Sequence, residues 1–207
     1  MRADPEATIR PRGHLLRLLT QNIDGLECFG NFIPEEKVEY AHGNFNSAHV
    51  VGTEEAVDPN VFREAVLGGE PAWTRMIESH GGVVKPGIVL FDDPLPNGFL
   101  NQAKADMERA DIVFIIGTSL KVSPCNQLIG HARKDVRRVY CNLELPDADK
   151  QKELGFDFFT RDFFIGGPCD QIAEHLADKL GLKDRMQTVY KAMQSYPVGG
   201  AAGRAEA

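Results

Sequence analysis

Four hydrogen-bonding side chains stand close together directly after an apolar stretch of the sequence: Thr20, Gln21, Asn22 and Asp24. Amides and a carboxylate are suited to binding a sugar hydroxyl or a carboxamide, and they can stabilise charge that develops on a reacting group. A second polar segment, His42-Gly43, ends another short apolar stretch, and histidine can act as a general base because it titrates near neutral pH. Taken singly, the first stretch also fits a loop that caps a helix, and His42 fits a surface histidine. The two together favour a ligand-binding edge.

Short apolar strands are predicted to position both groups of side chains. Leu15–Leu19 has the length and composition of a strand buried on both faces, as in a parallel sheet, and Val38–Tyr40 is a shorter strand that delivers His42. In open α/β sheets, ligands bind at the carboxyl ends of the strands. We therefore expect the two polar groups to lie at one edge of a sheet.

Two later strands end in a similar way. Ile112–Ile116 is fully apolar and breaks at Gly117-Thr118-Ser119, where glycine permits close backbone approach and the hydroxyl and N–H groups suit a phosphate or a ribose. Val136–Cys141 ends at Asn142, and Asn142 and Glu144 can hydrogen-bond the hydroxyls of a nucleoside. As isolated motifs these are weak indications, since many strand-to-helix turns look alike.

Strands and helices alternate along most of the chain, which predicts an α/β fold of the Rossmann-like class, with a parallel sheet and right-handed crossovers. Further strands are expected at 87–91 and 156–159, and helices at 59–67, 72–78, 98–110, 124–133 and 168–180. The residues expected on the buried faces of two of these helices are Val61, Phe62, Ala65 and Val66, and Ile172, Ala173, Leu176 and Leu180.

The chain is predicted to hold one main domain, at residues 15–182. Residues 52–79 form a small inserted helical module within it, and residues 1–14 are interpreted as a ragged N-terminus. The last segment, 183–207, is expected to contain a helix around Met186 and Val189, followed by a disordered tail.

The composition is that of a globular protein, with 43% hydrophobic and 26% charged residues. A net charge of −7 argues against nucleic acid as a ligand but would attract basic peptides. Apolar runs are far shorter than the ~20 residues that span a bilayer, and no secretory signal is visible, so no membrane partner is expected. The 4 cysteines form no C-x-x-C pair, which predicts reduced thiols in an intracellular compartment. That compartment is cytoplasmic or nuclear, with a mitochondrial location kept open by Arg2, Arg10 and Arg12.

The motifs, taken in order, resemble those of the sirtuins, the NAD-dependent protein-lysine deacylases. The matching segments are Thr20-Gln21-Asn22-Ile23-Asp24, His42-Gly43, Lys85-Pro86-Gly87-Ile88-Val89-Leu90-Phe91, Gly117-Thr118-Ser119-Leu120-Lys121-Val122 and Asn142-Leu143-Glu144. The resemblance runs from Leu15 to Leu182, and such an ordered set is far more specific than a lone glycine fingerprint. It implies a Rossmann-like fold, NAD as the cofactor, and an acylated-lysine protein or peptide as the partner.

The resemblance also implies roles for individual residues. His42 would be the base, acting through a ribose hydroxyl after nicotinamide leaves, and Asn22 and Asp24 would complete the catalytic group. Ile23 and Asp24 would hold the nicotinamide, while Gln21 and Asn22 would line the ribose and a water channel. The adenosine contacts would come from Gly117, Thr118, Ser119, Asn142, Glu144 and Cys169, and the acyl-lysine tunnel from Ile88, Val89 and Phe91.

The sequence departs from the family pattern in its cysteines and in one loop. Sirtuins usually carry two cysteine pairs that bind a structural zinc, but Val50, Ile77 and His80 stand at these positions, so no zinc is expected. An apolar core made by the inserted module would replace the metal. Asp92 and Asp93 stand where the family usually has glycine and then glutamate, which would change which peptides fit.

The front of the family domain is the larger departure. A strand, a glycine-rich phosphate loop and a cofactor loop precede the position of Leu15 in sirtuins, and nothing in residues 1–14 resembles them. We therefore expect weak NAD affinity, little turnover, and self-association through an exposed sheet. The main prediction is an NAD-dependent protein-lysine deacylase, and the alternative is a catalytically impaired protein that binds acyl-peptide or another partner. A hydride-transferring NAD enzyme ranks below both, because no G-x-G-x-x-G follows an early strand.

Overall fold

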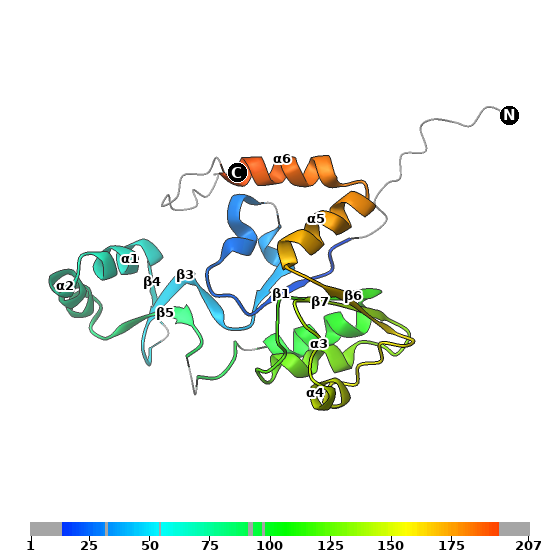
Figure 1. Ribbon diagram of the computed structural model, residues 1–207. Coiled ribbons are helices and arrows are strands. Elements are labelled where there is room, and N and C mark those ends of the chain that lie inside the picture. Colours follow the sequence, from blue (N-terminus) through cyan, green and yellow to red (C-terminus); the bar gives the residue numbers. More distant parts are fainter. Residues whose placement is uncertain (1–13, 32, 54, 91–92, 97, 195–207) are drawn as a thin grey trace.

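The computed structural model describes residues 14–31, 33–53, 55–90, 93–96 and 98–194 (Figure 1). Its framework consists of two small parallel sheets and one antiparallel sheet. The predicted ragged N-terminus and the predicted disordered tail lie almost wholly outside the described residues and stay predictions. Within the described ranges, no helix is both long and apolar enough to cross a bilayer.

The parallel strands carry the predicted ligand edge. β1 (Leu18–Thr20) pairs with β2 (Val38–Tyr40), and the second parallel sheet has the order β6 (Ile112–Ile116), β7 (Arg137–Asn142) and β8 (Asp162–Gly166). The α/β, Rossmann-like class with parallel strands is therefore confirmed. The strands at Val38–Tyr40 and Ile112–Ile116 have the predicted bounds, and β7 is shifted by one residue.

The first strand differs from the prediction. It covers Leu18–Thr20 rather than Leu15–Leu19, and Leu15 is 47% exposed. Among the described residues β1 has a sheet neighbour on one side only, so its two leucines are half-buried instead of buried on both faces. Thr20 is 7% exposed and lies opposite Tyr40 in the register. The strand therefore ends one residue later than predicted, and the first residue of the polar group lies inside the sheet.

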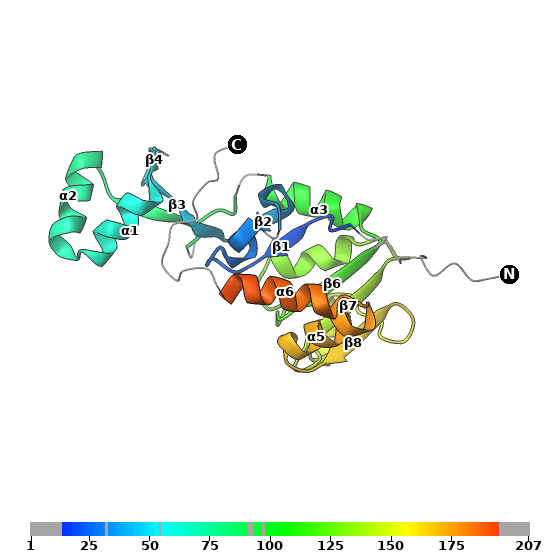
Figure 2. The same cartoon turned by 90° about the horizontal axis from the view of Figure 1, so that it is seen from above.

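The antiparallel sheet has the order β4 (Ala56–Val57), β3 (Gly43–Val50) and β5 (Val84–Ile88), with α1 (Pro59–Leu67) and α2 (Glu70–His80) packed against it. Both views show these two helices standing apart from the parallel sheets (Figures 1 and 2). The strand predicted at 87–91 is wrong in its bounds and in its sheet, because β5 pairs with β3 in antiparallel register from Val84 opposite Val50.

The helices of the segment 52–79 share one apolar core with β3 and β5. The buried members are Ala48, Val50, Val57, Ala65, Met76 and Val84. Phe62 and Trp73 pack against them, with ring centroids 5.8 Å apart. Asp58 caps α1 by accepting a hydrogen bond from the backbone N–H of Asn60, which the Asp-Pro sequence predicted. Val61 and Val66, expected on the buried face, are 41% and 52% exposed.

Helices cover one face of the β6–β8 sheet. α3 (Phe99–Arg109), the 3-10 helix η3 (Cys125–His131) and α4 (Ala148–Glu153) lie on this side, over Val113, Ile115 and Tyr140. The helix predicted at 98–110 is confirmed, and the one predicted at 124–133 is a 3-10 helix. α4 has no counterpart in the sequence-based prediction.

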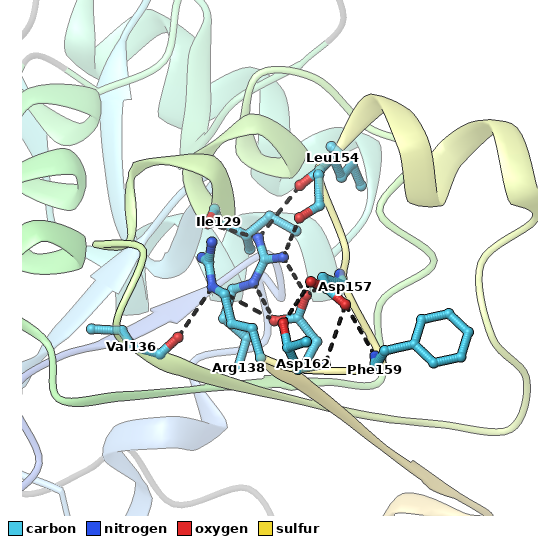
Figure 3. Close-up of polar contacts among 10 residues, drawn as sticks. Ile129, Val136, Arg138, Leu154, Asp157, Phe159 and Asp162 are labelled. Carbon is cyan, nitrogen blue, oxygen red and sulfur yellow. Dashed lines mark hydrogen bonds and ion pairs between the residues drawn. The ribbon is translucent and has the colours of Figure 1, made fainter.

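The strand expected at 156–159 is wrong, because these residues form turns and the edge strand is β8. Figure 3 shows the buried polar network that fixes β8 at its observed place. Arg138, 1% exposed, donates to both carboxylate oxygens of Asp162 over 2.6 and 2.5 Å and to the carbonyls of Ile129, Leu154 and Gly155. The segment 156–159 instead contributes Phe156 to this network. The centroid of its ring lies 4.7 Å from the guanidinium carbon of Arg138.

The other face of this sheet is only partly covered. α5 (Cys169–Lys179) packs Ile172 and Leu176 on Val139 and Cys141, and α6 (Lys183–Gln194) contacts α5 (Figure 2). Ala173 and Leu180, expected to point inward, are exposed, and Ala177 is buried instead. Beside α5, every second residue of β6 is open to solvent: Ile112, Phe114 and Ile116. One face of this fully apolar strand is therefore open to solvent.

Candidate active site

A tight turn after β2 holds His42 against the end of β1. The Nδ1 atom of His42 lies 3.2 Å from the backbone carbonyl oxygen of Gln21, and the His42 carbonyl accepts a hydrogen bond of 2.9 Å from the N–H of Val89. Gly43 has a φ of +64°, and a Cβ there would lie 1.9 Å from the carbonyl oxygen of Gly87. Only glycine fits this position, and its close contact with β5 fixes His42 between two strand ends.

Two of the residues expected to line an acyl-lysine tunnel lie close to His42. Ile88 is the last residue of β5 and lies opposite Gly43 in the sheet register. Val89 follows it and bonds to the His42 carbonyl. Phe91 lies outside the described residues. The structure therefore brings Ile88 and Val89 to His42, while their role in substrate binding stays a prediction.

Local hydrogen bonds order the polar segment after β1. The Thr20 hydroxyl donates to Glu27 Oε1 over 2.5 Å and accepts from the N–H of Asn22 over 3.1 Å. Asn22 Nδ2 donates to the same Glu27 oxygen over 3.4 Å. Asp24 Oδ1 accepts from the N–H of Leu26 over 3.2 Å, at the start of the 3-10 helix η1 (Leu26–Asn31). Asp24 is thus also the helix-capping residue that the alternative interpretation expected, yet it and Asn22 remain exposed.

Two contacts join this segment to the other sheets. The backbone carbonyl of Ile23 accepts a hydrogen bond of 3.1 Å from Phe45 of β3. Gln21 Oε1 accepts a hydrogen bond of 3.1 Å from the hydroxyl of Thr118, which lies just beyond β6. Burial raises the pKa of the nearby Cys125 thiol, and a hydrogen bond with Gln21 partly offsets that effect. Gln21 is therefore the side chain that links the two parallel sheets at their carboxyl ends.

The turn after β6 is held by side chains of β7. Gly117 has a φ of +65°, which favours glycine, and its N–H donates to the Cys141 carbonyl over 3.0 Å. The Thr118 carbonyl accepts hydrogen bonds from Tyr140 Oη over 2.8 Å and from Asn142 Nδ2 over 2.9 Å. The amide of Asn142 also donates to Tyr140 Oη over 2.8 Å. These hydrogen bonds from side chains of β7 fix the turn after β6.

The remaining predicted adenosine residues surround this turn. Ser119 and Glu144 are exposed. Cys169, half-buried, begins α5, and its Sγ atom would lie 3.4 Å from a Cβ on Gly117. Burial raises the pKa of the adjacent Cys141 thiol, to which the charge of Cys169 adds. The four cysteines are free.

The candidate site thus has two sides, which the Gln21–Thr118 hydrogen bond connects. We name these two sides after the roles predicted for them: the catalytic side is Gln21, Asn22, Ile23, Asp24 and His42, and the adenosine side is Gly117, Thr118, Ser119, Asn142, Glu144 and Cys169. Among the described residues, no three His, Cys, Asp or Glu side chains are grouped so that they could bind a metal ion. The expectation that the chain carries no zinc stays a prediction, which metal analysis of the purified protein would test.

Sequence reasoning missed two residues that shape the site. Tyr140 stands two positions before Asn142 on β7, so it lies on the same face of the strand, and that spacing was a usable signal. Glu27 contacts Thr20 and Asn22 only because η1 turns the chain back on itself. Nothing in the spacing of these residues indicates that contact.

The sequence is similar to that of a known protein family. The sequence profile of the Sir2 family matches residues 7–124. The NAD-dependent protein deacetylase hst2-2 of Emericella nidulans is 32% identical over 185 residues, which cover 89% of this chain and 50% of that protein. The NAD-dependent deacetylase sir2A of Dictyostelium discoideum is 38% identical over 184 residues (87% and 35%), and the NAD-dependent protein deacetylase sirtuin-2 of Danio rerio is 30% identical over 203 residues (88% and 50%). The chain therefore spans half or less of the length of these relatives.

Proposed function

Since this chain belongs to the Sir2 family, we propose that it removes acyl groups from protein lysine and consumes NAD in the reaction. The observation that carries the proposal is the connected path from His42 through Gln21 to Thr118, which joins the two sides of the site. The relatives described above are named NAD-dependent deacetylases, which supports the same reaction and acetyl-lysine as a substrate.

The side chains of the site fit NAD by their chemistry. Exposed amide, hydroxyl and carboxylate groups suit ribose hydroxyls and a carboxamide: Asn22, Asp24, Ser119 and Glu144. The positive φ of Gly117 gives a turn whose backbone a ligand can approach closely. When bound, NAD supplies the ribose carbon that receives the acyl oxygen and nicotinamide as the leaving group.

The hydrogen bond of His42 decides which of its nitrogens is basic. The Gln21 carbonyl can only accept a hydrogen, so the Nδ1 atom at 3.2 Å carries the ring proton. In the neutral ring Nε2 is then the unprotonated nitrogen, and it would take a proton from a ribose hydroxyl of bound NAD. The carboxylate of Asp24, exposed in the segment after β1, would favour positive charge on a ribose held there.

Product analysis tests the proposal. The chain is incubated at high concentration with NAD and an acetyl-lysine peptide, and nicotinamide, free lysine peptide and acyl-ADP-ribose are measured by mass spectrometry. We expect slow release of all three in equal amounts, with nicotinamide release that depends on the peptide. Formation of NADH would show hydride chemistry instead, and peptide binding without any nicotinamide would show the non-enzymatic alternative. Either result contradicts the proposal.

One observation favours a further partner for the chain, a second copy of itself. The outer face of β6 exposes Ile112, Phe114 and Ile116 by 49%, 46% and 56%, and β6 is an edge strand of its sheet. Exposed apolar edge strands pair with other chains. We expect sedimentation velocity to detect self-association that Phe114→Lys reduces. Phe159→Lys, a control at a fully exposed phenylalanine in a turn, should leave it unchanged. A monomeric wild-type chain would contradict this part of the proposal.

A further inference from the structure

We propose that Glu27 is a positioning residue, which orients the Asn22 amide so that Asn22 presents a hydrogen-bond acceptor to the ligand. This inference rests on the proposed function for its kinetic consequence, but its geometry stands on the described contacts alone. Glu27 lies on η1, outside every motif that pointed to the site.

Glu27 contacts Asn22 of the catalytic side and Thr20, which precedes it by two residues. Glu27 Oε1 receives the Thr20 hydroxyl hydrogen over 2.5 Å and lies 3.4 Å from Asn22 Nδ2. Thr20 has one hydroxyl hydrogen and gives it to Glu27, so its oxygen accepts the backbone N–H of Asn22 over 3.1 Å. Glu27 therefore holds Asn22 both directly and through a threonine that is 7% exposed.

The chemistry of a carboxylate decides how the Asn22 amide is turned. An ionised carboxylate has acceptor oxygens and no donor, so the NH2 group of Asn22 must face Glu27. The Oδ1 atom of Asn22 then points away from Glu27, on a side chain that is exposed to solvent. The ligand group that it can bind is a donor, either a ribose hydroxyl or a water molecule. Without Glu27 the amide is free to turn and to offer its NH2 group instead.

The second oxygen of Glu27 argues against a purely structural role. Oε2 is buried, and within the described part of the chain it has no hydrogen-bond partner. An unsatisfied buried acceptor is destabilising, so Glu27 is a poor choice for stability alone. Its negative charge also raises the pKa of neighbouring Tyr40, after the larger effects of burial and of the hydrogen bond with Cys28.

The experiment compares three substitutions. Glu27→Ala removes the acceptor, Glu27→Gln keeps an acceptor oxygen without the charge, and Glu35→Ala is the control. Glu35 is an exposed acid that also acts electrostatically on Tyr40, but no described hydrogen bond joins it to Asn22. The side-chain amide resonances of Asn22, assigned by their loss in Asn22→Ala, report its orientation in the free protein by NMR. Thermal melts confirm that each variant is folded.

We expect Glu27→Ala to move the Asn22 side-chain resonances towards those of a freely turning amide, and Glu27→Gln and Glu35→Ala to leave them close to wild type. Nicotinamide release should fall about 10–100-fold in kcat for Glu27→Ala, with little change in KM for the peptide, and Glu27→Gln should restore most of it. The double variant Asn22→Ala/Glu27→Ala should be no slower than Asn22→Ala.

Two results would overturn the positioning role. The first is an Asn22 side-chain signal that does not change in Glu27→Ala, and the second is an additive loss of rate in the double variant. If the wild-type chain releases no nicotinamide but the Asn22 signals respond as expected, the proposed function fails and the orientation of Asn22 by Glu27 stands.

Discussion

The two sides of the candidate site lie at the ends of two sheets that differ in size and in how they are held together. The adenosine side ends a three-stranded parallel sheet whose middle strand contributes Arg138 to a buried network with Asp162 (Figure 3). The catalytic side ends a two-stranded sheet in which β1 and β2 have three residues each. Its side chains are held by contacts within the segment and by the bond from Gln21 to Thr118. The comparison indicates that a buried network holds the adenosine side firmly, while the catalytic side depends on a few individual hydrogen bonds.

The largest expected effect comes from the catalytic side. His42→Ala should lower nicotinamide-coupled deacylation by about 10²–10⁴-fold, because a general base is lost. NAD binding should change much less, since the adenosine side is untouched. Peptide deacylation followed by mass spectrometry measures the first quantity, and titration calorimetry measures the second. His175→Ala, at an exposed histidine of α5, is the control and should behave as wild type. Turnover by His42→Ala at the wild-type rate would remove this residue from the mechanism.

Substitutions in the buried network of Arg138 and Asp162 should lower the free energy of unfolding. Arg138→Leu leaves the carboxylate of Asp162, whose side chain is 0% exposed, buried without its partner. Removing one partner of a buried ion pair costs roughly 3–5 kcal/mol in the free energy of unfolding. Urea denaturation measures it, with Lys183→Ala as the control, because Lys183 and Asp178 form an ion pair in which both side chains are more than half exposed. Such a surface pair contributes about 0–1 kcal/mol. Equal losses in the two variants would contradict the role given to the buried network.

The hydrogen bond that links the two sides should make a smaller contribution to the free energy of unfolding. A double-mutant cycle with Gln21→Ala and Thr118→Val isolates the hydrogen bond that joins them, which is 3.1 Å long. We expect a coupling of about 0.5–1.5 kcal/mol in the free energy of unfolding, the usual contribution of a neutral hydrogen bond. Additive losses, with a coupling near zero, would mean that the two sides are not joined in solution.

The smallest effect concerns the pH dependence of the catalytic side. Burial, the hydrogen bond from Tyr40 Oη to Cys28 Sγ and the negative charges of Glu27 and Glu35 raise the pKa of Tyr40 above 10. Because the folded-state pKa is raised, this group stabilises the fold fully below pH ~10, and that contribution is lost as pH rises through the folded-state value. Ultraviolet titration of wild type minus Tyr40→Phe should show no phenolate at pH ~10. A difference curve centred at the ordinary tyrosine value would contradict the described burial.

Local signals in the sequence predicted much of this molecule. Asp58 before Pro59 marks the start of α1, and the apolar runs of β2, β6 and β7 mark strands that end at polar residues. Such features depend on neighbours in sequence, so they can be read without the fold. The same holds for four of the five motifs, which lie at the carboxyl ends of parallel strands, whereas the motif at 85–91 lies on and after β5 of the antiparallel sheet.

The features that local patterns did not predict depend on how the chain is arranged in space. Phe156 belongs to an apolar run that suits a strand, but its ring packs on Arg138, and β8 begins at Asp162 because Arg138 binds its carboxylate. Phe114 is apolar and yet exposed, because α5 covers only the neighbouring strands of that face. The contact of Glu27 with Asn22 follows from a turn geometry that no spacing encodes.

One measurement tests most directly the central claim that both sides form a single NAD site. NAD is titrated into the labelled chain while the backbone amide signals of Gly43 on the catalytic side and of Gly117 and Asn142 on the adenosine side are followed by NMR. If the two sides form one site, all three signals move along one binding curve with one weak Kd, and adenosine alone moves only the signals of Gly117 and Asn142. Movement restricted to the adenosine side at saturating NAD, or two separate Kd values, would contradict it.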